Sequence, residues 1–204
     1  MKKKYLIMAC CFIFIFIGKN TNLFPEDIPD EVSEMNNEQR VFDDIDDEYK
    51  LINYFLNSKQ KKYCRSLEDI DKRKFIEEFW KANDPNPITE KNEFLEEIKF
   101  RIEYCNRYFT HFNPGWKTDR GRIYIKYGKP YEILKEITGV SAKYPQKDYH
   151  IWKYRITNYL TFIFIDIQQH GNFRLIFSDG DDAEGSWADW LNYLGSDFDE
   201  GKLY

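Results

Sequence analysis

The stretch NPGWKTDRGRIYIKYGKP, residues 113–130, lies where the apolar pattern of the chain changes. Before it, apolar residues recur every three or four positions, as on the buried face of a helix. The clearest such set is Phe94, Ile98, Ile102, Cys105 and Phe109. From Arg122 onward, within the stretch and beyond it, apolar and polar residues alternate as in β-strands. This order predicts an α+β fold in which N-terminal helices pack on a mostly antiparallel sheet of four to five strands.

The same patterns predict the extent of each element. We expect helices at about 38–56, 66–82 and 89–110, with a short helix or turn at 59–65. Ser66 and Asp69 are candidate caps for the second helix, and the third is expected to begin at Thr89. Alternation predicts strands at 122–126, 131–137, 149–156, 160–167 and 173–177, and a closing helix at 186–194.

Composition limits the class of protein. The chain has 204 residues, of which 42% are hydrophobic and 18% aromatic, which is too apolar for a disordered chain and suits one domain with a tail. Only three histidines are present, so a His-rich metal site is not expected. The net charge is −5, and an acidic domain is a poor candidate for binding nucleic acid.

The N-terminus has the pattern of a secretory signal peptide. Lys2, Lys3 and Lys4 form a basic start, and an unbroken apolar run follows from Tyr5 to Ile17. The run is shorter than the roughly 20 residues that span a bilayer. We therefore expect a signal peptide at 1–18, export to the periplasm or cell envelope, and a mature domain with a more negative net charge.

The leader leaves two alternatives open. Cys10 follows Ile-Met-Ala and could accept a lipid, although the apolar run continues past it. The leader could also stay uncleaved and associate with a membrane. Beyond the leader we expect a linker at 19–37 and a domain at 38–204, with a helical part at 38–112, a sheet part at 116–180 and a C-terminal segment at 181–204.

Two cysteines remain after the leader, Cys64 and Cys105. In an exported protein they could form one disulfide, or they could be two buried free thiols. The sequence leaves both alternatives open.

Most site motifs are absent from the sequence. Gly128-Lys129-Pro130 lacks the spacing of a phosphate-binding loop, and no zinc-ligand pair or nucleophile elbow is present. The acidic run at 178–185 is interpreted as a polar turn rather than a calcium loop. We therefore expect no catalytic residue, no cofactor and no metal.

The segment Gly115–Gly121 is the main candidate for a structural or binding role. Trp116 can fill the seam between helices and sheet, and we expect it to be largely buried. Asp119, helped by Thr118, can accept hydrogen bonds from backbone N–H groups or from arginines. Strand alternation predicts that at most one of Arg120 and Arg122 pairs with Asp119. The full set of candidates is Gly115, Trp116, Thr118, Asp119, Arg120 and Gly121.

This segment resembles the motif that names the GWxTD domain family, and flanking matches extend the resemblance over about 45–177. They include Phe79-Trp80, Asp84-Pro85 and Ile151-Trp152. Asn83 stands where the family usually has Arg, which puts any ion pair of that residue in doubt. The resemblance implies a bacterial, often exported protein of uncharacterised activity, and it supplies no catalytic residues.

Two functions are consistent with these observations. The first is a non-enzymatic envelope module that binds another envelope protein or acts as a scaffold. The alternative is a carboxylate-based hydrolase acting on a cell-wall or carbohydrate substrate, with Asp119, Asp166 or Glu93 as its acids. A structure separates them by showing what these carboxylates contact.

Overall fold

The computed structural model describes residues 40–156, 159–180 and 184–204. The chain divides into two compact units, one ending at Lys99 and the other beginning at Phe100. Each unit is described by itself below. The signal peptide expected at 1–18 and the linker expected at 19–37 lie outside the described residues.

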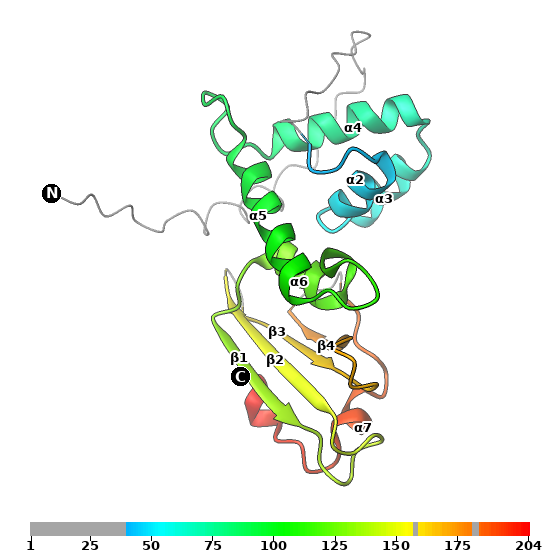
Figure 1. The fold of residues 1–204 in the computed structure, drawn as a ribbon, viewed down its shortest axis with the longest axis vertical. Coiled ribbons are helices and arrows are strands. Elements are labelled where there is room, and N and C mark those ends of the chain that lie inside the picture. The colour runs from blue at the N-terminus through cyan, green and yellow to red at the C-terminus, as the bar shows by residue number, and fades with distance from the viewer. Residues whose placement is uncertain (1–39, 157–158, 181–183) are drawn as a thin grey trace, which may run out of the picture. The chain divides into compact units, whose positions relative to one another are not determined.

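The first unit is helical (Figure 1). It contains α2 (Ile45–Ile52), α3 (Ser58–Arg65), α4 (Asp69–Ala82) and the beginning of α5 (Glu93–Tyr108). Asp44 caps α2 by accepting from two backbone N–H groups, and Asn57 and Gln60 form a capping box on α3. Phe55, Phe79 and Phe94 form a cluster of ring contacts in its core.

Among the described residues of this unit, the carboxylate of Glu48 is buried. Glu48 accepts from the backbone N–H groups of Val41 and Phe42 and, at 2.7 Å, from Trp80 Nε1. Burial raises the pKa of Glu48, although these three donors act in the opposite direction. Glu48 therefore ties the start of the described chain to α4.

Two expected helix starts are wrong. Helix α4 begins at Asp69 without a side-chain cap, and Ser66 instead ends α3 by donating its hydroxyl to Tyr63 O. Helix α5 begins at Glu93 rather than near Thr89, because Asn92 Oδ1 accepts from Leu95 N and caps it. Asn92 also donates its side-chain amide to Trp80 O at 2.7 Å, a contact with α4 that the local sequence pattern does not show.

The second unit contains the sheet. After η2 (Gly115–Lys117) and α6 (Asp119–Tyr127), the strands are β1 (Glu132–Ile137), β2 (Asp148–Arg155), β3 (Tyr159–Ile165) and β4 (Arg174–Asp179). They form one antiparallel sheet in the order β1-β2-β3-β4. The chain then forms α7 (Trp190–Leu194) and η3 (Glu200–Leu203). Helices precede an antiparallel sheet, which confirms the α+β class.

The strand expected at 122–126 is wrong, because these residues belong to α6. Ile123, Tyr124 and Ile125 are all buried. The stretch 122–126 is a short apolar run between two basic residues, and a run this short does not distinguish a strand from a buried helix by its period. The other expected strands are present within a few residues of their predicted bounds.

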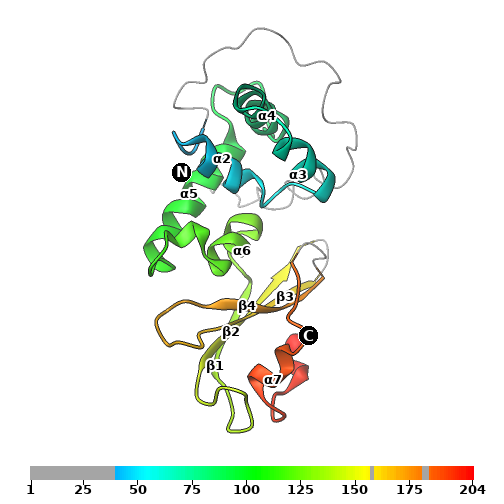
Figure 2. The same ribbon diagram turned by 90° about the vertical axis from the view of Figure 1, so that its right-hand side faces the viewer.

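The sheet is covered on both faces (Figure 2). On one face, Trp152 contacts Phe109 and Tyr124, and Phe162 stacks with Tyr127 of α6. On the other, the C-terminal segment packs against the strands in a core to which both contribute. That core comprises Tyr149, Ile151, Ile163, Ile165, Ile176, Leu194 and Leu203.

The helical phase predicted for α5 is confirmed. Ile98, Ile102 and Phe109 are buried, as the spacing of the apolar residues requires.

Cys64 and Cys105 are both buried free thiols, so the two do not form a disulfide with each other. Burial raises the pKa of Cys105 to about 12, so this thiol stays protonated.

Candidate functional site

The two glycines of Gly115–Gly121 are required by close backbone contacts. A Cβ atom on Gly115 would lie 1.8 Å from Cys105 O in α5, and one on Gly121 would lie 2.0 Å from Gly115 O. Both neighbours are backbone atoms, which cannot move aside as a flexible side chain can. Glycine therefore lets η2 lie directly against α5 and lets α6 start directly against η2.

Trp116 and Thr118 fix the turn between these elements. Trp116 is only 3% exposed, which confirms its expected burial, and its backbone N–H donates to Asn106 Oδ1. Thr118 is the N-cap of α6, accepting from Gly121 N at 2.9 Å and donating to Gly115 O at 2.7 Å. The threonine hydroxyl thus satisfies a free N–H of the helix and closes η2 at the same time.

Asp119 connects α6 to strand β4. Its Oδ2 accepts from Leu175 N and from Arg174 Nε, both at 3.0 Å. Its Oδ1 accepts from Arg122 Nη2 at 3.0 Å, one turn along the helix. The expectation that Asp119 accepts from backbone N–H groups and arginines is therefore confirmed. A negative charge in the first turn also suits the helix dipole.

The ion pairs extend beyond Asp119. Arg122 also pairs with Glu184, whose other carboxylate oxygen lies 4.0 Å from Lys126 Nζ. Glu184 is buried, so this small network joins α6 to the segment that follows β4. Part of the acidic run interpreted as a polar turn at 178–185 therefore has a specific partner on α6.

Arg120 has a different partner from Arg122. Its Nη2 donates to Gly171 O at 3.1 Å, and its guanidinium lies 4.8 Å from the centre of the Phe109 ring and 4.0 Å from that of Phe173. Burial lowers the pKa of Arg120 to about 10, and the charge of Asp166 opposes that shift. Only one of the two arginines pairs with Asp119, as expected, but helix spacing rather than strand alternation is the reason.

Asp166 and His150 lie around the same hairpin. Asp166 is buried and accepts from His170 N at 3.3 Å and Gly171 N at 2.6 Å, which closes the turn between β3 and β4. His150 stacks on Phe173 with ring centres 4.3 Å apart. Burial lowers the pKa of His150 to about 4, and the charge of Arg120 adds to the shift. His150 is therefore neutral at pH 7.

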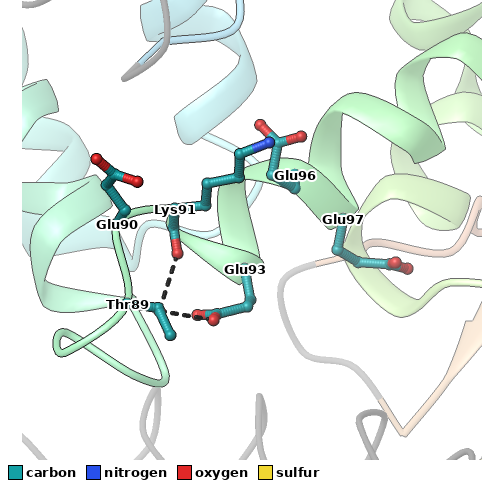
Figure 3. A pocket seen from close by; sticks show the side chains of 6 residues that line it. All are labelled: Thr89, Glu90, Lys91, Glu93, Glu96 and Glu97. Carbon is teal, nitrogen blue, oxygen red and sulfur yellow. Dashed lines mark hydrogen bonds between the residues drawn. The ribbon is translucent and has the colours of Figure 1, made fainter. Parts of the chain in front are cut away.

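The first unit has an open acidic hollow at the start of α5 (Figure 3). Its volume is about 660 Å³, and it is lined by Thr89, Glu90, Lys91, Glu93, Glu96 and Glu97. Glu93 Oε1 accepts from Thr89 Oγ1 at 2.7 Å, which lowers the pKa of this exposed carboxyl. The carboxylates of Glu93 and Glu97 point in opposite directions (Figure 3), so they do not form a facing pair.

Two further findings concern the described residues alone. In the ranges 40–156, 159–180 and 184–204, no three His, Cys, Asp or Glu side chains come together as a metal site would require. Within these ranges, too, every helix is too short or too polar to cross a bilayer.

The geometry of Gly115–Gly121 explains why its residue types occur together: close glycines, a buried tryptophan, a threonine cap and an aspartate that binds the sheet. The family model of the GWxTD domain matches residues 25–187, most of the chain. The chain belongs to the GWxTD domain family. No curated protein and no solved structure matches it. The GWxTD motif of this chain lies wholly within the second unit.

Sequence reasoning missed three residues that bind side chains of α6. Arg174, Leu175 and Glu184 contact α6 from positions more than 50 residues along the chain. No local pattern marks them, although interpreting 119–127 as a helix would have placed Asp119 and Arg122 on one face. Asn83, which replaces the usual Arg, ends α4 by donating its side-chain amide to Phe79 O.

Proposed function

We propose that this GWxTD protein is an exported cell-envelope module that binds another protein and is not an enzyme. The observation that carries the proposal is the use of the motif. The Asp119 carboxylate accepts three bonds at 3.0 Å, all of which join α6 to itself or to β4. The GWxTD segment therefore has a structural role, in which it holds α6 against β4. We expect the residues that bind the partner to lie elsewhere, on the surface of the protein.

The sequence supports the location. The basic start and the apolar run from Tyr5 to Ile17 have the composition of a secretory leader. Export to the periplasm or envelope follows from that pattern. The leader can be cleaved near Gly18, lipidated at Cys10 or kept uncleaved at a membrane.

The surface supports a binding role. Large apolar side chains are exposed in the second unit, among them Phe112, Ile137, Val140 and Tyr159. Of the exposed apolar residues, Ile133 and Ile137 lie on the same strand, β1, and apolar side chains exposed close together mark interaction sites more often than isolated ones do. The hydrolase alternative has less support, because Asp119 and Asp166 are both occupied by bonds that hold the fold.

Site-specific crosslinking tests the proposal. A photoreactive residue would replace one exposed apolar side chain at a time in cells that express the protein, with Glu103 as a matched polar position on α5. We expect one discrete crosslinked protein from a subset of the apolar positions and none from Glu103. The enzyme alternative would instead be supported if the protein hydrolyses a cell-wall polysaccharide and a folded Asp119→Asn or Asp166→Asn variant does not.

A further inference from the structure

The two edges of the sheet differ in how their backbone groups are satisfied. On the β4 edge the chain covers itself, since Leu175 N donates to Asp119 and Trp187 N donates to Ile176 O at 2.9 Å. Ser186 Oγ accepts from Ser178 N at 2.9 Å and donates to Ser178 O at 3.1 Å. The outward groups of β4 are therefore paired by side chains and by the following segment.

The β1 edge has no such cover among the residues that the structure describes. In an antiparallel ladder, alternate residues direct both backbone groups to the neighbouring strand, and the residues between them direct theirs away. Thr138 N donates to Lys147 O in the β1–β2 register, so Glu136, Leu134 and Glu132 face β2. The N–H and C=O groups of the three intervening residues, Ile133, Lys135 and Ile137, therefore point outward.

The side chains of these three residues are also exposed and share one face of the sheet. Ile133 is 42% exposed and Ile137 is 64% exposed, with the exposed Lys135 between them. The strand pairs regularly with β2 over all six of its residues, with no register shift. Edge strands are normally protected by bulges, prolines or several charges. On the face that carries the three outward residues, β1 has one lysine between two isoleucines, with no proline and no bulge in the strand.

The charges of β1 indicate what would fit this edge. Glu132 and Glu136 are on the opposite face, where they pair with Lys153 and Lys202 at 3.1 and 3.0 Å. Lys135 has no carboxylate partner among the described residues. A strand added beside β1 would place one of its own residues directly opposite each of the three outward residues. Apolar residues suit the two isoleucines, and an acidic residue suits Lys135.

A second copy of the chain fits this edge less well. Antiparallel pairing of two β1 strands that uses all three outward residues places Ile133 against Ile137 and Lys135 against Lys135. Like charges directly opposite one another destabilise a strand pair. The edge therefore favours a different polypeptide over self-association.

We propose that β1 is a docking site for an extended segment of a partner protein, in which an acidic residue lies between two apolar residues at alternate positions. This inference rests on the proposed function, since it identifies the surface and the kind of partner. The added strand forms backbone hydrogen bonds with Ile133, Lys135 and Ile137, and its alternate side chains provide selectivity.

Selection from a displayed library of short random peptides tests the inference on the purified full chain. We expect enriched peptides to carry Asp or Glu with apolar residues two positions away on either side. In NMR spectra, these peptides should shift and protect the amides of Ile133, Lys135 and Ile137 but not that of Leu175. Methylating alternate backbone nitrogens of the peptide should abolish binding.

Charge reversal provides the matched comparison. Lys135→Glu should weaken the selected acidic peptides roughly three- to tenfold and should change the library preference to Lys or Arg at the same position. Lys129→Glu, an exposed lysine just before the strand, should leave both affinity and preference unchanged. Peptides that bind Lys135→Glu as well as the unchanged protein would overturn the inference.

Other outcomes would also overturn it. Slow amide exchange at Ile133, Lys135 and Ile137 in the free monomer would show that another part of the chain covers β1. A dimer whose interface maps to β1 would show that a second copy is the occupant. If β1 selects no peptide while crosslinks arise from other exposed positions, the docking site is wrong and the proposed binding function stands. If no exposed position crosslinks, the proposed function itself fails.

Discussion

Replacement of Asp119 by asparagine tests whether the motif stabilises the fold by connecting α6 to β4. The substitution keeps the size of the side chain but removes its charge and turns one acceptor oxygen into a donor. Depending on how the amide is oriented, either Arg122 Nη2 alone or both Leu175 N and Arg174 Nε would face an N–H group in place of an acceptor oxygen.

The three bonds do not contribute equally to stability. Arg174 is 57% exposed, so its ion pair contributes well under about 1 kcal/mol. Arg122 is one-quarter exposed and has a second partner in Glu184, which gives a contribution of up to about 1 kcal/mol. The charge-assisted bond from Leu175 N is partly buried and contributes most, about 1–2 kcal/mol. We expect Asp119→Asn to lower the free energy of unfolding by about 2 kcal/mol, and Tm by roughly 4–8 °C.

Urea unfolding followed by circular dichroism measures this change, with Arg174→Gln as the control. Arg174→Gln should lower stability by less than about 0.5 kcal/mol, because it removes only the exposed pair. NMR should also show faster exchange of the Leu175 amide in Asp119→Asn. Unchanged unfolding with lost binding of a partner would refute the reasoning and make Asp119 a binding residue.

Three further expectations follow from the structure and the sequence. Gly115→Ala places a methyl group against the backbone of α5 and should cost about 3 kcal/mol or more in a denaturant titration, whereas Gly185→Ala, with open space around its Cβ, should cost under about 0.5 kcal/mol. The pKa of His150 is lowered to about 4 in the folded protein, so the unfolded chain takes up a proton on His150 first as pH falls from about 6.5. Compared with the His150→Gln variant, the protein should therefore lose about 2 kcal/mol of its free energy of unfolding by pH 4. Equal pH profiles for the two proteins would contradict this. Mass spectrometry of the exported protein should find an N-terminus near Lys19 without lipid, and a diacylglyceryl group on Cys10 would reverse that expectation.

Local periodicity was sufficient to predict helix α5 and the strands of the sheet. Helix α5 has apolar residues on a single stripe, and β2 to β4 alternate or form short apolar runs, so each shows its own period in the sequence. Helix α6 was predicted as a strand, because the apolar run at 123–125 is too short for its period to distinguish a helix from a strand. Its two flanking signals, the Thr118 cap and Gly128 at its end, were the only local indications of a helix.

The sequence by itself therefore determined the α+β order, the membership suggested by the GWxTD motif, and the burial of Trp116, since these depend on residues close together in the chain. Only the tertiary structure decided which groups Asp119 binds, because Arg174 and Leu175 are 55 and 56 residues away. It also decided which sheet edge is closed. Trp187 and Ser186 return to β4 and satisfy its outward groups, while β1 keeps its own directed away from the sheet. Those pairings depend on chain segments meeting in space, which spacing along the sequence does not record.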